Sequence, residues 1–205
     1  MVELFKSGGP FMWPILGLFA FGLCICFERI YTLTKSSIAT KRFVPKMNEA
    51  LKQDGVPAAI DICENTPGPV SEIFHAGLSR AKFGVSAVEK AIENAGTVEM
   101  AFLERGMIWL STVIVIAPML GFAGTVAGMV KAFQDIEAAN NISPAVVAGG
   151  ISEALLTTLF GLIVGMICQF FYNIFTSRVD GIVIDMEESS INLIDTISLI
   201  ESEKK

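Results

Sequence analysis

The chain consists of long apolar segments separated by longer or shorter polar segments. Three blocks, residues 11–27, 107–130 and 154–175, are almost wholly apolar, and none of them contains a charged side chain. A helix needs about 20 apolar residues to cross the hydrocarbon core of a bilayer. The pattern therefore predicts three transmembrane helices, the first just long enough to span and the other two long enough to span with a tilt.

The segments outside these blocks also have helical periodicity. Residues 28–106 contain four short amphipathic stretches, at 41–54, 56–64, 70–82 and 87–105, separated by glycines and prolines. Residues 131–153 are expected to form a short loop, and residues 176–205 a helical tail. The predicted fold class is an all-α membrane protein with three transmembrane helices and a helical domain outside the bilayer.

Lysine and arginine are distributed unevenly around the predicted spans. Residues 28–106 carry ten of them, whereas the loop at 131–153 has only Lys131 and residues 1–10 have only Lys6. Positively charged residues remain on the cytoplasmic side of a membrane. We therefore expect residues 28–106 and the tail to be cytoplasmic, and the N-terminus and the short loop to lie on the opposite side.

Composition excludes several classes of function. Apolar residues make up 52% of the chain, charged residues only 18%, and the net charge of −6 leaves no basic surface for nucleic acid. The four cysteines form no Cys-x-x-Cys pattern, and His75 stands alone. We interpret the cysteines as reduced apolar fillers. Because no nucleophile–base pair or metal constellation is present, we predict no enzyme activity, cofactor or metal.

Small and hydroxyl residues recur on one face of the second span and one face of the third. In the second span they are Pro118, Gly121, Gly124, Thr125 and Gly128. In the third they are Ala154, Thr157, Thr158, Gly161 and Gly165. Such faces permit close helix packing, which is the simplest interpretation of the glycines.

The hydroxyl residues also share a depth in the membrane. Thr125 lies about five residues before the outer end of the second span, and Thr158 about four residues after the outer start of the third, so both are roughly 6–8 Å below the outer boundary. In an oligomer they could form a polar ring, although each threonine could equally bond a carbonyl of its own helix. Glu153 either guides protons or cations or simply complements the helix dipole.

A proton carrier needs a titratable group near the middle of the bilayer. The three predicted spans contain no Asp, Glu, His, Lys or Arg. If the chain conducts protons, a partner protein must therefore supply the carboxylate.

Two long motifs resemble those of the ExbB/TolQ/MotA proton-channel family. The second span has APMLG at 117–121 followed by GTVAGM at 124–129, and the third has ISEALLTTLFGL at 151–162. The segments NTPGP at 65–69 and LERG at 103–106, with Glu28-Arg29, also fit. Three spans with a large first cytoplasmic segment are similar to the ExbB/TolQ branch.

The resemblance implies a homo-oligomeric ring, pentameric in known members, around an ExbD/TolR-like single-span partner whose aspartate carries the proton. Thr125 and Thr158 would line the pore, with Glu153 as the associated acidic residue. Thr157 stands where a small apolar residue is common, so either Thr157 or Thr158 faces the pore. The implied location is the bacterial inner membrane, with a periplasmic N-terminus and a cytoplasmic C-terminus.

The implied function is energy transduction from the proton motive force to work at the envelope. That work is nutrient uptake, a Tol-type function or motility, and a TonB/TolA-like or other periplasm-spanning effector would receive it. A non-conducting membrane scaffold, in which the threonines only pack, is the alternative.

Overall fold

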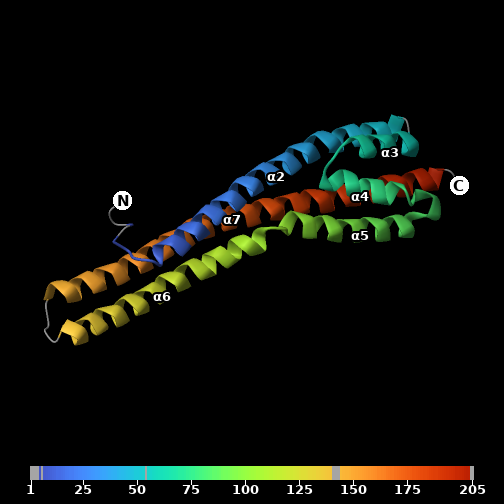
Figure 1. Cartoon of the computed structure of the whole chain (residues 1–205). Helices are drawn as coiled ribbons and strands as arrows, with labels where there is room; N and C mark the ends of the chain where they lie inside the picture. Colours follow the sequence, from blue (N-terminus) through green and yellow to red (C-terminus); the bar gives the residue numbers. More distant parts are fainter. Residues whose placement is uncertain (1–4, 6, 54, 140–143, 204–205) are drawn as a thin grey trace. The chain divides into compact units, whose positions relative to one another are not determined.

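The computed structural model describes residues 5, 7–53, 55–139 and 144–203. Regular structure in these residues is helical throughout, which confirms the expected all-α fold. In chain order the helices are α2 (Met12–Gln53), α3 (Gly55–Asn65), α4 (Pro69–Leu78), the 3₁₀ turn η1 (Ala81–Phe83), α5 (Val85–Glu104), α6 (Met107–Ala139) and α7 (Pro144–Glu203) (Figure 1).

Three stretches of helix are long and apolar enough to cross a membrane, within Met12–Leu51, Val85–Ala138 and Ala148–Leu199. They cover the three spans predicted from the sequence, except for Phe11, which precedes α2. Large apolar side chains on them are exposed, including Trp13 at 68%, Phe122 at 67% and Phe170 at 65%. Because such surface is unfavourable in water, these helices need lipid or other apolar partners around them.

The helices are longer than the sequence blocks suggested. Residues 41–53 of the predicted segment at 41–54 are the end of α2, and Asp54 lies outside the described residues. The tail is continuous with the third span in the 60-residue helix α7. No glycine or proline lies between the first span and Pro45, so nothing ends the helix there. The only glycine in the tail, Gly181, is tolerated at a modest cost in helix propensity.

The expected loop at 131–153 is largely helical. Helix α6 continues to Ala139, and α7 begins at Pro144. The polar sequence KAFQDIEAA at 131–139 consists mostly of residues that favour helix, and proline is well suited to the first turn of a helix. Residues 140–143 lie outside the described part of the chain.

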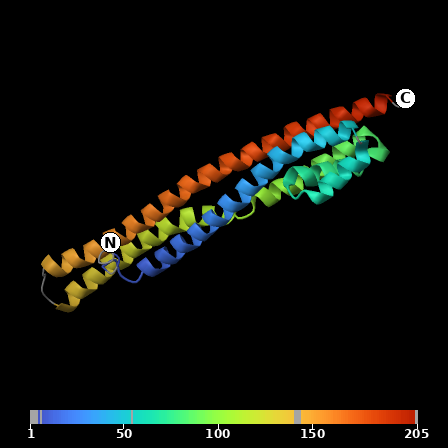
Figure 2. The ribbon, with the colours of Figure 1, turned by 90° about the horizontal axis from the view of Figure 1, so that it is seen from above.

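The chain divides into two compact units, each containing part of α2 and part of α7. The first, here called the span unit, comprises Met1–Glu28 and Gly106–Ile174. In it the beginnings of α2 and α7 run beside α6 (Figures 1 and 2). Gly22 of α2 packs on α7 and α6, because a β-carbon there would lie 2.9 Å from the Cys168 sulfur and 3.5 Å from the Val113 side chain.

The second unit, here called the polar unit, comprises Arg29–Arg105 and Phe175–Lys205. Its core includes Phe43 and Phe74, whose rings meet edge to face at 5.5 Å. Along α7 the buried side chains of this unit recur at helical spacing and include Ile182, Met186, Leu193 and Ile197.

Arg29, the first residue of this unit, is hydrogen-bonded to the end of α5. Its side chain is 6% exposed and donates a hydrogen bond of 3.1 Å to the carbonyl of Leu103, in the last turn of α5. The chain then turns at Gly106, whose φ of +94° is a left-handed conformation that favours glycine. Helix α5 therefore ends beside α2, and α6 starts as a separate helix.

Candidate functional site

Helices α6 and α7 approach each other most closely where two glycines meet. A β-carbon on Gly161 would lie 2.6 Å from the carbonyl oxygen of Ala117 and 3.1 Å from the Cα of Gly121. On Gly121 it would lie 3.0 Å from the Cα of Thr158. These neighbours are backbone atoms, which cannot move aside as a side chain can. The two backbones are therefore in direct contact, a spacing that only small residues permit.

The other predicted packing residues extend this seam in both directions. Gly128 faces Ala154, where a β-carbon would lie 3.1 Å from that methyl group, and Gly165 faces the ring of Pro118 at 2.9 Å. The small-residue faces of the second and third spans thus pack against each other within one chain.

A cluster of hydroxyl groups lies in the middle of the seam. The Oγ1 atoms of Thr125 on α6 and Thr158 on α7 are hydrogen-bonded to each other, and both residues are half-buried. Both hydroxyls also approach the carbonyl oxygen of Gly121, at 3.2 Å from Thr125 and 3.0 Å from Thr158. This contact places the two hydroxyls side by side on adjoining helices, and their depth in a membrane stays a prediction.

Thr157 occupies a different environment from Thr158. It is 2% exposed, donates a hydrogen bond of 2.7 Å to the Ala154 carbonyl of its own helix, and fills the notch at Gly124. A β-carbon on Gly124 would lie 2.9 Å from the Thr157 Cβ. Thr157 is thus enclosed between α6 and α7, whereas Thr158 keeps part of its surface open.

Glu153 lies one turn of α7 before Thr157 and contacts the turn that precedes α2. The φ of Gly9 is +68°, and a β-carbon there would overlap a Glu153 carboxylate oxygen. The carboxylate therefore occupies the space in which any other residue at position 9 would place its side chain. Sequence reasoning missed this contact, although the Gly8-Gly9-Pro10 run before the span was a signal of a tight turn.

The chemistry available to this cluster is solvation and hydrogen bonding. A hydroxyl donates one hydrogen bond and accepts two, so Thr125 and Thr158 keep acceptor capacity after bonding each other and Gly121. They could hold a water or accept a bond from a protonated carboxyl group. Proton transfer itself needs a group that titrates near neutral pH, and the three predicted spans contain no Asp, Glu, His, Lys or Arg.

Known proteins with similar sequences are named as ExbB-like or TolQ proteins. A "Putative biopolymer transport protein ExbB homolog" of Methanothermobacter thermautotrophicus is 35% identical over 181 residues, which cover 88% of this chain and 64% of that protein. The "Putative biopolymer transport protein ExbB-like 3" of Synechocystis is 27% identical over 173 residues, 83% of this chain and 82% of that one. The "Tol-Pal system protein TolQ" of Haemophilus influenzae is 32% identical over 116 residues, 57% of this chain and 49% of its own length.

Residues 65–188 match the family described as the MotA/TolQ/ExbB proton channel family. This range is more than half of the chain and contains α4, α5, α6 and the part of α7 that carries Glu153 and the threonines. The match confirms the resemblance inferred from the two span motifs, and the named relatives are consistent with the ExbB/TolQ branch. The chain is therefore a multi-pass membrane protein that belongs to the MotA/TolQ/ExbB proton channel family.

Proposed function

We propose that this chain is the channel-forming subunit of a complex driven by the proton motive force. It conducts protons together with a single-span, ExbD/TolR-like partner that carries an aspartate in its span. The complex uses the proton flow for work at the envelope of a bacterial inner membrane. Residues 28–106 and the tail face the cytoplasm, and the N-terminus faces the periplasm.

The observation that supports this proposal is the half-buried pair formed by Thr125 and Thr158. A partner's carboxyl group must lose its water when it enters an apolar lumen, which is costly for a polar group without hydrogen bonds. The two hydroxyls offer acceptors to the protonated form. Thr157 is enclosed within the chain and acts in packing, so we assign the pathway to Thr125 and Thr158, with Glu153 at its outer end.

A ring of identical chains, pentameric in this proposal, would enclose the partner. Because the small-residue faces pack within one chain, contacts between subunits use other surfaces. Exposed apolar stripes are available for this purpose on α6 and α7. They include Phe122, Val126 and Val130 on α6, and Leu155, Leu159 and Leu162 on α7.

A non-conducting scaffold is the alternative, and one observation favours it. Each hydroxyl of the cluster has an acceptor within its own chain, at the carbonyl of Gly121 or of Ala154. Such internal bonds occur in membrane helices that conduct nothing. The choice between the two functions therefore depends on flux rather than on geometry.

Reconstitution in vesicles distinguishes a proton channel from a non-conducting scaffold. The chain is purified with the single-span protein encoded beside it, and proton uptake is followed with an internal pH-sensitive dye under an imposed potential. We expect flux from the complex, and none from the chain alone or from a complex whose partner aspartate is replaced by asparagine. Equal proton flux from all three preparations would contradict the proposal.

A further inference from the structure

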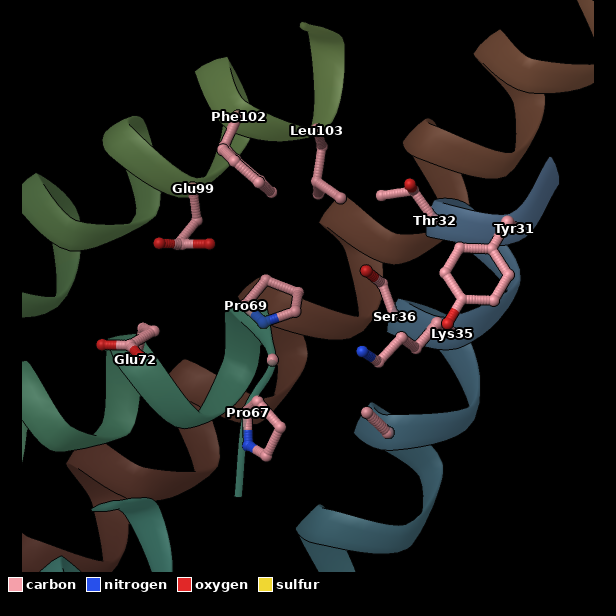
Figure 3. Close-up of a pocket in the computed structure, with 12 residues that line it drawn as sticks. Tyr31, Thr32, Lys35, Ser36, Pro67, Pro69, Glu72, Glu99, Phe102 and Leu103 are labelled. Atoms are coloured by element: carbon pink, nitrogen blue, oxygen red, sulfur yellow. The ribbon is translucent and has the colours of Figure 1, made fainter. Parts of the chain in front are cut away.

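The polar unit contains a pocket that the proposed proton pathway does not use. Its volume is about 370 Å³, and its walls come from α2, the turn before α4, α4 itself and α5. Figure 3 shows Lys35 on one side of the pocket and Glu72 and Glu99 on the other, with Pro69 and Phe102 between them. All of these residues belong to the same unit, so the pocket is complete within it.

The charged side chains that line this pocket, Lys35, Glu72 and Glu99, form no ion pairs with one another. Among the residues that the structure describes, no hydrogen bond or ion pair joins the side chains of Lys35, Glu72 or Glu99 to another group. Burial, and then the charge of Glu72, raise the pKa of the Glu99 carboxyl above its ordinary value. A cation placed between the two carboxylates would relieve both effects.

The remaining walls suit the apolar stem of a cationic side chain. Phe102 is 55% exposed and Tyr31 is 70% exposed, so two aromatic rings stand at the pocket with free surface. Arginine and lysine bury their methylene stems on such surfaces, and a guanidinium also stacks on aromatic rings. On the opposite wall, the ammonium of Lys35 can donate to a peptide carbonyl.

We propose that this pocket binds a basic peptide segment, with an arginine or lysine side chain held between Glu72 and Glu99. The segment is the cytoplasmic flank of a membrane-anchored partner. Of the residues that line the pocket, Tyr31 comes first in the sequence and Leu103 last, and each is a few residues from a predicted span. Positively charged residues concentrate where spans enter the cytoplasm. This identification rests on the proposed topology and single-span partner.

Binding of a defined peptide to the purified, full-length chain tests the proposal. The probe is a fluorescein-labelled octapeptide with two adjacent arginines in an alanine and leucine background, and its control is the same peptide with uncharged citrulline at those positions. Fluorescence anisotropy should show the arginine peptide binding at least about tenfold more tightly, the factor expected for a hydrogen bond to a charged group.

Matched variants locate the binding. Glu72→Gln and Glu99→Gln should each weaken binding of the arginine peptide by about tenfold. Glu93→Gln should leave it unchanged, because Glu93 lies on the same helix but lines a different pocket, with Met100 and Met186. Ser36→Trp, which fills the pocket from α2 without removing a carboxylate, should also block binding. Melting curves check that each variant is folded.

Two results would overturn the proposal. One is equal binding of the arginine and citrulline peptides. The other is equal weakening by Glu93→Gln and Glu99→Gln, which would mean general attraction to an acidic chain. Neither result depends on proton flux, so a failure here leaves the channel proposal untouched, and a failure of flux leaves this site standing.

Discussion

Glu99 illustrates how a single side chain can be important for binding while it reduces stability. Its carboxyl group is partly buried on α5 near Glu72, and both the burial and the neighbouring charge raise its pKa. A carboxyl group whose pKa is higher in the folded chain than in the unfolded chain binds its proton more strongly when folded. Its ionisation therefore opposes folding as the pH rises.

Replacement of Glu99 by glutamine should therefore stabilise the chain in a pH-dependent way. Below the ordinary pKa of a glutamate, near 4.5, both states of the wild type are protonated, so the variant should melt at the wild-type temperature. Above the raised pKa, the variant should melt at a higher temperature than the wild type. Melting curves between pH 4 and pH 8 measure the difference. A higher melting temperature at pH 4 that disappears at pH 8 would reverse the sign and contradict the assignment.

Individual site residues differed in how far the sequence could predict them. The level shared by Thr125 and Thr158 followed from counting residues along two spans, because helical rise is constant. The difference between Thr157 and Thr158 did not, since adjacent residues are separated only by the rotation of α7 against α6. The contact between Glu153 and Gly9 joins segments far apart in the chain, which no local pattern reports.

At the scale of helices, the seam between α6 and α7 sets the position of the hydroxyl cluster. Gly121 and Gly161 bring the two backbones together, and Thr125 and Thr158 lie beside that point of contact. The existence of these helices was predictable from hydrophobic blocks. Their ends were not, because the polar continuations of α6 and α7 carry no residue that ends a helix decisively, and α2 continues to Gln53 past Pro45.

Gly161→Ala should weaken this seam. The new methyl group would press on the carbonyl of Ala117 and the Cα of Gly121, and overpacking of this kind costs about 1–3 kcal/mol. Gly17→Ala is the matched control, since no atom lies within 4 Å of its β-carbon position and alanine favours helix. Thermal unfolding in detergent compares the two. Equal melting temperatures for Gly161→Ala and the wild type would show that the helices are not in backbone contact there.

At the scale of the whole molecule, the account depends on which parts of the chain face the cytoplasm. The proposed peptide site lies in the polar unit, and it can meet the basic flank of a span only on the cytoplasmic side. The orientation follows from ten lysines and arginines in residues 28–106 against one each in the other two segments. It remains a prediction that labelling can test.

Single cysteines in a cysteine-free background should report opposite sides of the membrane. Ala138→Cys near the end of α6 and Ser79→Cys after α4 are both exposed positions. In intact spheroplasts a membrane-impermeant maleimide should label position 138 but not position 79, and both should react after lysis. Labelling of position 79 but not of position 138 before lysis would invert the topology.

Proton flux through valine variants of the hydroxyl cluster tests the central claim most directly. Valine has nearly the shape of threonine without its hydroxyl, so Thr125→Val and Thr158→Val remove hydrogen bonds with little change in packing. In vesicles with the partner, the proton flux of the double variant should be at least about tenfold lower than that of the wild type. This is the factor expected for a lost hydrogen bond to a charged or ionising group. Thr157→Val, which removes an internal bond to Ala154, should stay within about twofold of the wild type. Wild-type flux from an assembled Thr125→Val/Thr158→Val complex would contradict the assignment of the proton pathway to these two residues.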